Sequence, residues 1–231
     1  MKNHIRISLF IDGGYDAKVN QFYTEVHPRR SPLHFSGLKN FVRKQVAARE
    51  HVAEMNCLMV QGHYFRGRLM YPHTDVAAEW ELDNALIKTD IATHYLPLVD
   101  GKEKGIDSLL ALEAFELVMN NKVDVIALYA GDTDHISLVR KCTAAGVRIL
   151  LLGWDFAYTD AAGKWHITHT SRDVRDAVTY SLHMASLINN LDHHPDPSLE
   201  GIFSRSATNQ AQPQIADKIY GRPHAGDIPA A

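Results

Sequence analysis

Short apolar runs alternate with segments of helical spacing along most of this 231-residue chain. The run IRISLFI at residues 5–11 is rich in β-branched residues and ends in Asp-Gly-Gly, which predicts a buried strand followed by a tight turn. Further strands are expected at residues 56–61, 91–98, 123–130 and 147–152, and helices at 37–50, 77–89, 108–120 and 136–145. Strict alternation predicts an α/β fold of three α/β/α layers, in which helices cover both faces of a mainly parallel sheet.

The sequence beyond residue 152 predicts smaller elements. Residues 163–170 (GKWHITHT) are typical of a short edge strand or hairpin arm, and residues 171–190 of a last amphipathic helix. After Leu191 the chain is rich in Pro, Ala, Gln, Ser and Asp, as in a mobile tail. We expect one domain over residues 1–191 and a flexible C-terminal tail over residues 192–231, which is a candidate segment for docking a protein partner.

Composition argues against several classes of protein. A net charge of -3 and a pI near 6.5 disfavour nucleic-acid binding through a positive charge spread over the whole surface. They do not exclude binding through a local basic patch. The chain has no apolar run near 18 residues and no secretory signal pattern, so we expect no membrane span and a cytoplasmic location. The two cysteines, Cys57 and Cys142, are expected to be buried free thiols. A homo-oligomer is one of the alternatives that the composition allows.

Four aspartates stand at predicted junctions between strands and helices. They are Asp12 after the first strand, Asp107 at the start of a helix, and Asp132 and Asp134 after the strand in VIALYAGDTDH. The carboxyl ends of parallel strands share one rim of a sheet, where such folds bind ligands. Two ionised carboxylates ~5 Å apart repel by ~3 kcal/mol at an effective dielectric of about 20, so a cluster of four requires protons or metal ions. Oxygen ligands favour Mg²⁺ or Mn²⁺ over zinc, which points to a phosphodiester substrate.

Each of these aspartates also has a purely structural explanation. Asp12 is a common turn residue before glycines, and Asp107 and the Gly-Asp-Thr-Asp segment can cap helices. A shared site is favoured because three turns far apart in sequence should reach one edge of one sheet. Glu113 follows Asp107 by six residues and faces elsewhere on an ideal helix, so we expect it to have a surface or indirect role.

Three segments carry a known signature: LFIDGGY, then EKGIDSLLALEAFE, then VDVIALYAGDTDHISLVRKCTAAGVRILLLG. Over about residues 5–153 the chain resembles the NYN domain family, in particular its LabA-like group within the PIN-like nucleases. The resemblance implies a PIN-like fold and endoribonuclease activity that depends on Mg²⁺ or Mn²⁺. It also implies metal binding by Asp12, Asp107, Asp132 and Asp134, with Glu113 at an acidic position usually filled by Asp.

Two positions depart from the family pattern. Family members commonly carry Asn where this chain has Tyr15, and an aromatic residue where it has His135. Tyr15 supplies no amide, although the neighbouring Asp16 offers carboxylate oxygens from a shifted position.

The chemistry that this resemblance predicts is hydrolysis of RNA phosphodiesters assisted by one or two metal ions. Asp12 and Asp132 would hold the principal ion, with Asp107 and Asp134 completing its shell directly or through water. Lys104 is a candidate for pairing with a phosphate, and is equally well explained as a solvated loop lysine.

Candidate contacts to single-stranded RNA lie in GHYFRGR, where Tyr64 is followed by Arg66 and Arg68. Rings stack on bases and arginines contact phosphates, but a loop whose aromatic residues pack inward explains the same pattern. Thr133, between two of the aspartates, is a further candidate for contacting substrate. The fourteen histidines show no His-Glu-x-x-His pattern, and their spacing along the chain does not favour a histidine metal site.

Several competing functions have sequence motifs of their own. The patterns Gly-x-Gly-x-x-Gly, Gly-x4-Gly-Lys-Ser/Thr and Gly-x-Ser-x-Gly are absent, which disfavours dinucleotide-binding enzymes, P-loop proteins and α/β-hydrolases. A phosphatase with Asp12 as its nucleophile usually carries a second Asp where this chain has Gly14. A non-catalytic RNA- or protein-binding regulatory module is favoured by Tyr15 and by the acidic net charge.

Overall fold

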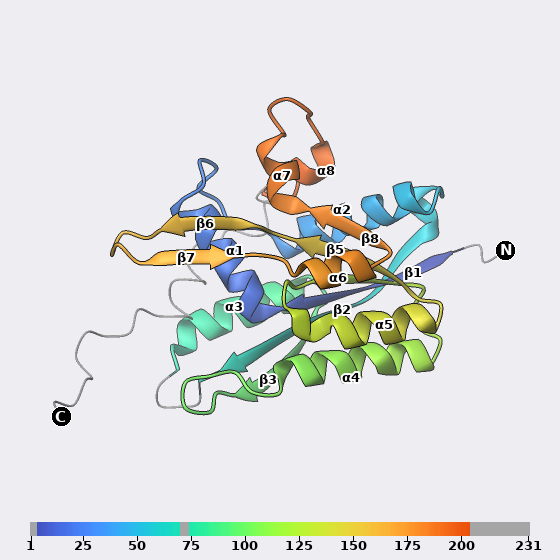
Figure 1. Cartoon of the computed structure of the whole chain (residues 1–231), viewed down its shortest axis with the longest axis horizontal. Helices are drawn as coiled ribbons and strands as arrows, with labels where there is room; N and C mark the ends of the chain where they lie inside the picture. The colour runs from blue at the N-terminus through green and yellow to red at the C-terminus, as the bar shows by residue number, and fades with distance from the viewer. Residues whose placement is uncertain (1–3, 70–73, 204–231) are drawn as a thin grey trace.

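The structure is a computed structural model that describes residues 4–69 and 74–203. Its centre is a six-stranded sheet with the order β3-β2-β1-β4-β5-β8, in which every neighbouring pair is parallel (Figure 1). The strands are β1 (Ile5–Asp12), β2 (Cys57–Arg68), β3 (Ala92–Pro97), β4 (Val125–Tyr129), β5 (Arg148–Gly153) and β8 (Tyr180–His183). The strand order reverses between β1 and β4, which is where sheets of this kind bind ligands.

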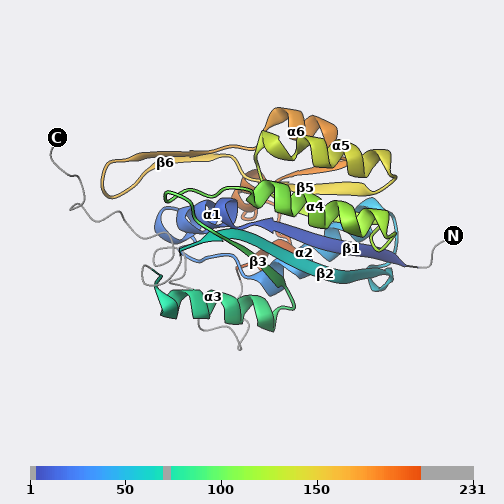
Figure 2. The ribbon, with the colours of Figure 1, turned by 90° about the horizontal axis from the view of Figure 1, so that it is seen from below.

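Helices cover both faces of this sheet (Figure 2). One face carries α1 (Gly13–Glu25), α2 (Phe35–Arg49), α3 (Val76–Lys88), α7 (Met184–Asn189) and α8 (Pro197–Glu200). The other carries α4 (Ile106–Met119), α5 (Ile136–Ala144) and α6 (Arg172–Ala177). Side chains of β1 alternate between the two cores, with Leu9 and Ile11 under α1 and Phe10 under α4, as the pleat of a doubly covered strand requires.

The predicted α/β/α architecture is confirmed, and the first part of the chain departs from it in two places. The helix α1 begins directly at Gly13, where a tight turn was expected, because the Asp12 side chain accepts a hydrogen bond from Tyr15 N at 3.1 Å and caps the helix. The strand β2 continues to Arg68 rather than ending at residue 61, so GHYFRGR lies within a strand.

The chain after β5 shows one confirmed element and one error. Residues 163–170 contain β7 (Trp165–Thr168), which pairs with β6 (Phe156–Thr159) in the expected hairpin. The single helix predicted over residues 171–190 is wrong, since this segment forms α6, β8 and α7. The apolar residues of this segment have helical spacing, but part of it forms the strand β8 instead. A strand can pair its backbone hydrogen-bonding groups with the open edge of β5, whereas a helix cannot.

The described chain continues to pack beyond Leu191, the residue at which the predicted domain ends. In the last described segment, Leu199 and Ile202 are buried in the core beside α1 and α2. His34 N donates to Ile202 O at 2.8 Å, and Arg29 makes a two-pronged ion pair with Glu200 at 2.8 Å. Residues 204–231 of the predicted tail lie outside the described residues.

Two further features follow from composition. Both Cys57 and Cys142 are buried free thiols, as expected. Within the described ranges, the helices are too short or too polar to cross a bilayer.

At Gly37 the backbone of residues 201–202 comes close to α2, and a substitution there tests this packing. A Cβ there would stand 2.7 Å from Ile202 Cα and 2.8 Å from the Gly201 carbonyl carbon. Replacing Gly by Ala in an unhindered helix stabilises it by up to about 1 kcal/mol. We nevertheless expect Gly37→Ala to lower the free energy of unfolding by about 1–3 kcal/mol, because the backbone of residues 201–202 must move.

Urea unfolding followed by circular dichroism measures this loss. The control is Asn40→Ala, an exposed position on the same helix. A Gly37→Ala variant as stable as the parent protein would show that residues 201–202 do not press on α2.

Candidate metal centre

Three chain segments meet at the carboxyl end of β1. Asp12 is the last residue of that central strand. Asp107 lies in the first turn of α4, two residues after the N-cap Gly105, whose positive φ of 81° turns the chain into the helix. His135 ends η2 (Thr133–His135), the short 3-10 helix between β4 and α5. The sheet therefore places two of the four predicted aspartates at the predicted rim.

These three side chains form the cluster Asp12–Asp107–His135. One ligand atom from each lies within 4.8 Å of the other two, and His135 Nε2 is 3.7 Å from Asp107 Oδ1. The His135 ring is 1% exposed, and among the described residues neither of its nitrogens has a hydrogen-bond partner. A buried imidazole without partners is costly. A divalent cation between the two carboxylates would accept a lone pair of this ring, so the residues present fit such an ion.

A further carboxyl group, that of Glu103, lies beside this cluster. Its Oε1 accepts a hydrogen bond from Gly67 N at 2.6 Å. A Cβ at Gly14 would stand 2.9 Å from Glu103 Oε2 and 3.3 Å from Asp12 Oδ1, so both acids flank this glycine. Glu103 is the first residue of EKGID, the segment that supplied the candidates Lys104 and Asp107, and it was not predicted because no pattern in the sequence distinguishes it from a solvated loop residue.

The electrostatics of the cluster favour a positive charge. Burial raises the pKa of Asp12, and the neighbouring Asp107 raises it further, while the hydrogen bond from Tyr15 N and the proximity of His135 act in the opposite direction. Burial likewise raises the pKa of Glu103, with Asp12 and Asp107 adding to the effect. Each carboxylate thus holds its proton more tightly than in water, and a metal ion would take the place of these protons.

Asp132 and Asp134 lie at the surface beside the cluster. Both are exposed, and Asp132 Oδ1 accepts a hydrogen bond from Asp134 N at 3.2 Å, which caps η2. Within the described part of the chain, the convergent group contains His135 from this segment and neither of these aspartates. Thr133 Oγ1 donates to Ser171 Oγ at 3.0 Å, and Lys104 is exposed in the loop between β3 and α4.

The proposed RNA contacts in GHYFRGR point mainly into the protein. Tyr64 is 2% exposed and Arg66 is fully buried, where it forms an ion pair with Glu79. Arg68 is partly exposed and pairs with Glu79 at 2.9 Å and with Asp83 at 3.2 Å. The strand thus matches the explanation in which its aromatic residues pack inward, with both arginines paired to acids of α3.

Tyr15 has a structural role behind the cluster. Its hydroxyl accepts from Trp154 N at 2.8 Å and lies 3.0 Å from Trp154 O, and burial raises its pKa to about 12. A Cβ at Gly131 would stand 2.5 Å from Tyr15 Cε2, so the ring packs under the Gly-Asp-Thr-Asp turn. Tyr15 therefore ties α1 to the end of β5 and supports the turn that carries His135.

Asp16 is buried in the layer beneath Asp12. Burial raises its pKa to about 7, and the nearby charge of Asp12 contributes in the same direction. Tyr64 Oη donates to its Oδ2 at 3.4 Å and Asn20 Nδ2 to its Oδ1 at 2.8 Å, which partly offsets the effect of burial.

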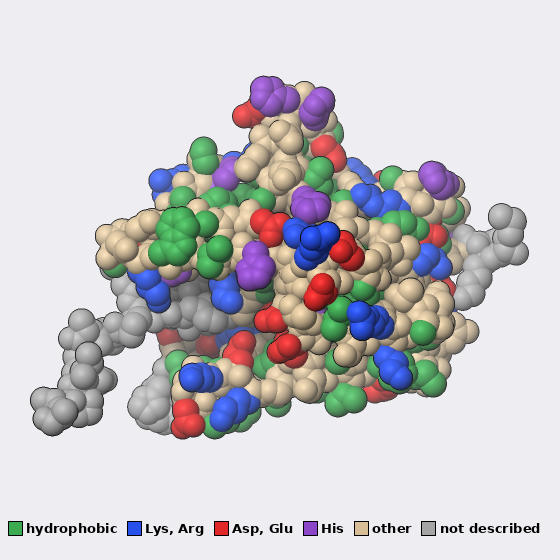
Figure 3. Space-filling view, viewed as in Figure 1, with side chains coloured by type: hydrophobic (Ala, Val, Ile, Leu, Met, Phe, Trp, Pro, Cys, Tyr) green, Lys and Arg blue, Asp and Glu red, His purple; other side chains and the backbone are tan. Residues whose placement is uncertain are grey.

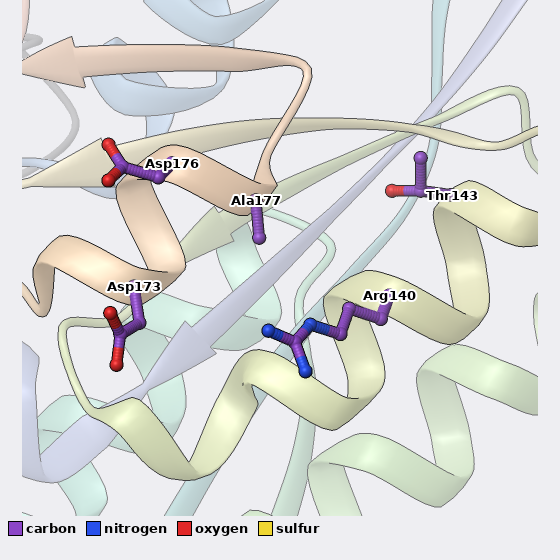
Figure 4. A pocket seen from close by; sticks show the side chains of 5 residues that line it. All are labelled: Arg140, Thr143, Asp173, Asp176 and Ala177. Atoms are coloured by element: carbon purple, nitrogen blue, oxygen red, sulfur yellow. The ribbon is translucent and has the colours of Figure 1, made fainter.

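The surface around these residues is shown from one side in Figure 3, where acidic side chains gather next to the N-terminal ends of α4 and α5. A shallow pocket between α5 and α6 is lined by Arg140, Thr143, Asp173, Asp176 and Ala177 (Figure 4). None of the cluster residues lines this pocket, so the acidic rim and the pocket are separate features.

The raised pKa of Asp16 predicts a pH dependence of stability. A carboxyl whose pKa rises from 3.8 to about 7 on folding binds its proton more tightly in the folded state. Its stabilising contribution is therefore complete below about pH 4 and is lost as the pH rises through about 7. We expect the free energy of unfolding in chelator to fall less between about pH 5 and about pH 8 in Asp16→Asn than in the parent protein.

Urea titrations across that range give the measurement, with the exposed Asp173→Asn as the control. Identical pH profiles for Asp16→Asn and the parent protein would contradict the assignment.

Comparison with known proteins places the sequence in a family. The family model for the NYN domain matches residues 6–184. No curated protein matches the sequence. A crystal structure of a protein of unknown function from Vibrio parahaemolyticus shares the fold, with 16% sequence identity, a TM-score of 0.50, and coverage of 79% of this chain and 94% of the other. Because the family model spans most of its length, this chain belongs to the NYN domain family.

Proposed function

We propose that the protein is a metal-dependent endoribonuclease that hydrolyses RNA phosphodiesters at the Asp12–Asp107–His135 cluster. The observation that supports this function best is the convergence of three ligand atoms within 4.8 Å, at the strand-order reversal of an NYN domain. Membership of this PIN-like family of predicted ribonucleases supplies the substrate class. The cofactor is Mg²⁺ or Mn²⁺, and the imidazole nitrogen of His135 favours Mn²⁺ of the two.

Each residue has a distinct part in this proposal. A bound ion supplies an activated water and stabilises charge on the phosphate as the bond breaks. Asp12 is held for ligation by the hydrogen bond from Tyr15 N, and Asp107 by its place on α4. Glu103 lies close to Asp12, burial raises its pKa, and it is a candidate for accepting a proton from the attacking water.

Among the remaining predicted residues, the exposed ones have parts in this proposal. The exposed Asp132 and Asp134 contribute ligands through water. The exposed Lys104 pairs with a phosphate of single-stranded RNA, and the exposed Thr133, between the two aspartates, contacts the substrate. Tyr64 and Arg66 have no part in RNA binding because both are buried.

A second candidate function is a non-catalytic RNA- or protein-binding module with the same fold. It is favoured by the commitment of Tyr15 to Trp154, since no amide replaces the residue that the family commonly has there. It is also favoured by the placement of Asp132 and Asp134 outside the convergent group.

Cleavage of a labelled single-stranded RNA in Mn²⁺ tests the proposal. We expect Asp107→Asn to reduce Mn²⁺-stimulated cleavage by at least about 100-fold, because one charged ligand of the cluster is lost. The control is Glu116→Gln, an exposed acid on the same helix, and circular dichroism checks that both variants fold. Cleavage at the parental rate by Asp107→Asn would overturn the site, and RNA binding in chelator without cleavage by the parent protein would establish the second function.

A separate variant tests the exposed aspartates. Asp132→Asn removes a charge but keeps the cap of η2, because Asn caps helices about as well as Asp. We expect it to abolish Mn²⁺-stimulated cleavage without altering the unfolding transition. Unchanged cleavage in Asp132→Asn, with loss in Asp107→Asn, would restrict the metal ligands to the Asp12–Asp107–His135 cluster.

A further inference from the structure

A second group of ligand-bearing side chains lies between the sheet and α4. It consists of His63 on β2, His94 on β3 and Glu113 on α4, with one ligand atom from each within 4.8 Å of the others. We propose that this triad, His63–His94–Glu113, is a binding site for a transition-metal cation of the zinc class. The site is distinct from the aspartate cluster in residues and in ligand chemistry, and it does not depend on the proposed ribonuclease activity.

The two imidazoles already stand at a spacing that suits a shared ion. His63 Nδ1 lies 3.0 Å from His94 Nε2. Two ligands bound to tetrahedral zinc at about 2.0–2.1 Å are about 3.3 Å apart, so the rings need to move by only a few tenths of an ångström. The carboxylate of Glu113 approaches from α4, with Oε1 4.0 Å from His94 Nδ1.

The hydrogen bonds around these rings leave a place for a cation. His63 Nε2 lies 3.2 Å from Gln61 Oε1, which only accepts, so Nε2 carries the proton and Nδ1 carries a lone pair toward His94. If His94 donates from Nε2, its Nδ1 lone pair faces the Glu113 carboxylate, and two acceptors oppose each other. A cation bound by His63 Nδ1, His94 Nε2 and one oxygen of Glu113 frees His94 Nδ1 to carry a proton toward the same carboxylate, so the lone pairs of both imidazoles have partners.

The surroundings of the triad hold its rings in place. His63 stacks on Phe10 with ring centroids 4.7 Å apart, and His94 stacks on Phe65 at 4.4 Å. Burial lowers the pKa of His63 to about 4, with His94 adding to the effect, and burial also lowers the pKa of His94. Both rings are thus in the neutral form that binds metals.

The triad is open to solvent on one side. His63 is buried, whereas the side chains of His94 and Glu113 are 19% and 35% exposed. An ion therefore reaches the site past these two residues, and water can fill its remaining coordination position. Two nitrogens and one carboxylate oxygen select a transition metal over Mg²⁺, which prefers oxygen ligands.

A bound ion would connect three elements that flank the aspartate cluster. The loop over residues 98–105 leaves β3, which carries His94, and enters α4, which carries Glu113. Glu103 lies in this loop. The expected consequence is a stabilised edge of the sheet and a more firmly held loop.

Metal titration of the full chain tests the inference, with calorimetry for Zn²⁺ and visible absorption for Co²⁺. The reference protein is Asp12→Asn/Asp107→Asn, in which the first cluster is disabled, and we expect it to bind one equivalent of Zn²⁺ and to melt at higher temperature with Zn²⁺ than in chelator. Adding His94→Ala or Glu113→Gln to this background should lower the affinity for Zn²⁺ by more than about 100-fold, because loss of a residue that only hydrogen-bonds to a metal ligand costs about 100-fold at most. The visible absorption band of bound Co²⁺ should disappear in the same variants.

The matched control is His166→Ala. His166 also contacts an acid, with Nε2 2.8 Å from Asp160 Oδ2, but among the described residues it belongs to no group of three ligands. It should leave Zn²⁺ affinity unchanged, and melting in chelator verifies that each variant is folded. The inference is overturned if the reference protein takes up no Zn²⁺, or if folded His94→Ala and Glu113→Gln variants bind it as tightly as the reference.

Discussion

Parallel pairing of β1 with β2 on one side and β4 on the other determines where the groups of the Asp12–Asp107–His135 cluster meet. In this register Asp12 stands opposite Phe65, and Ile11 stands opposite Tyr129. The chain then needs only a few residues after Tyr129 to bring His135 beside Asp12. Since α4 packs on the same face, its first turn brings Asp107 to the same place. The acidic rim is a consequence of the strand order and not of any local motif.

The carboxylates gathered at this rim cost stability in the absence of a cation. Burial raises the pKa values of Asp12, Asp16 and Glu103, so folding works against their ionised forms. The protein tolerates this because the surrounding packing is extensive, with Tyr15, Tyr129 and Trp154 in mutual ring contact beneath the cluster. A rigid base that holds acids in an unfavourable arrangement is typical of functional sites.

The sequence was sufficient to predict five of the six strands of the sheet, the helices α2 to α5, and the placement of Asp12 and Asp107 at junctions between strands and helices, because these follow from periodicity and from strand ends. It was insufficient where the outcome depends on tertiary pairing. The segment after Ser171 has helical spacing but forms β8, since the open edge of β5 offers hydrogen bonds. The turn after Gly131 directs His135 inward and leaves Asp132 exposed, which residue types alone do not reveal. His63 and His94 are 31 residues apart and meet only because β2 pairs with β3.

The two clusters are mechanically related through α4. Asp107 and Glu113 are six residues apart on this helix, which corresponds to about 9 Å along its axis. Between the clusters lie Phe10 and Phe65, whose stacked rings fill the space between the sheet and α4. Packed aromatic rings deform little, so the two sites are joined rigidly. An ion bound at either of the proposed sites would therefore restrain the helix that carries a ligand of the other.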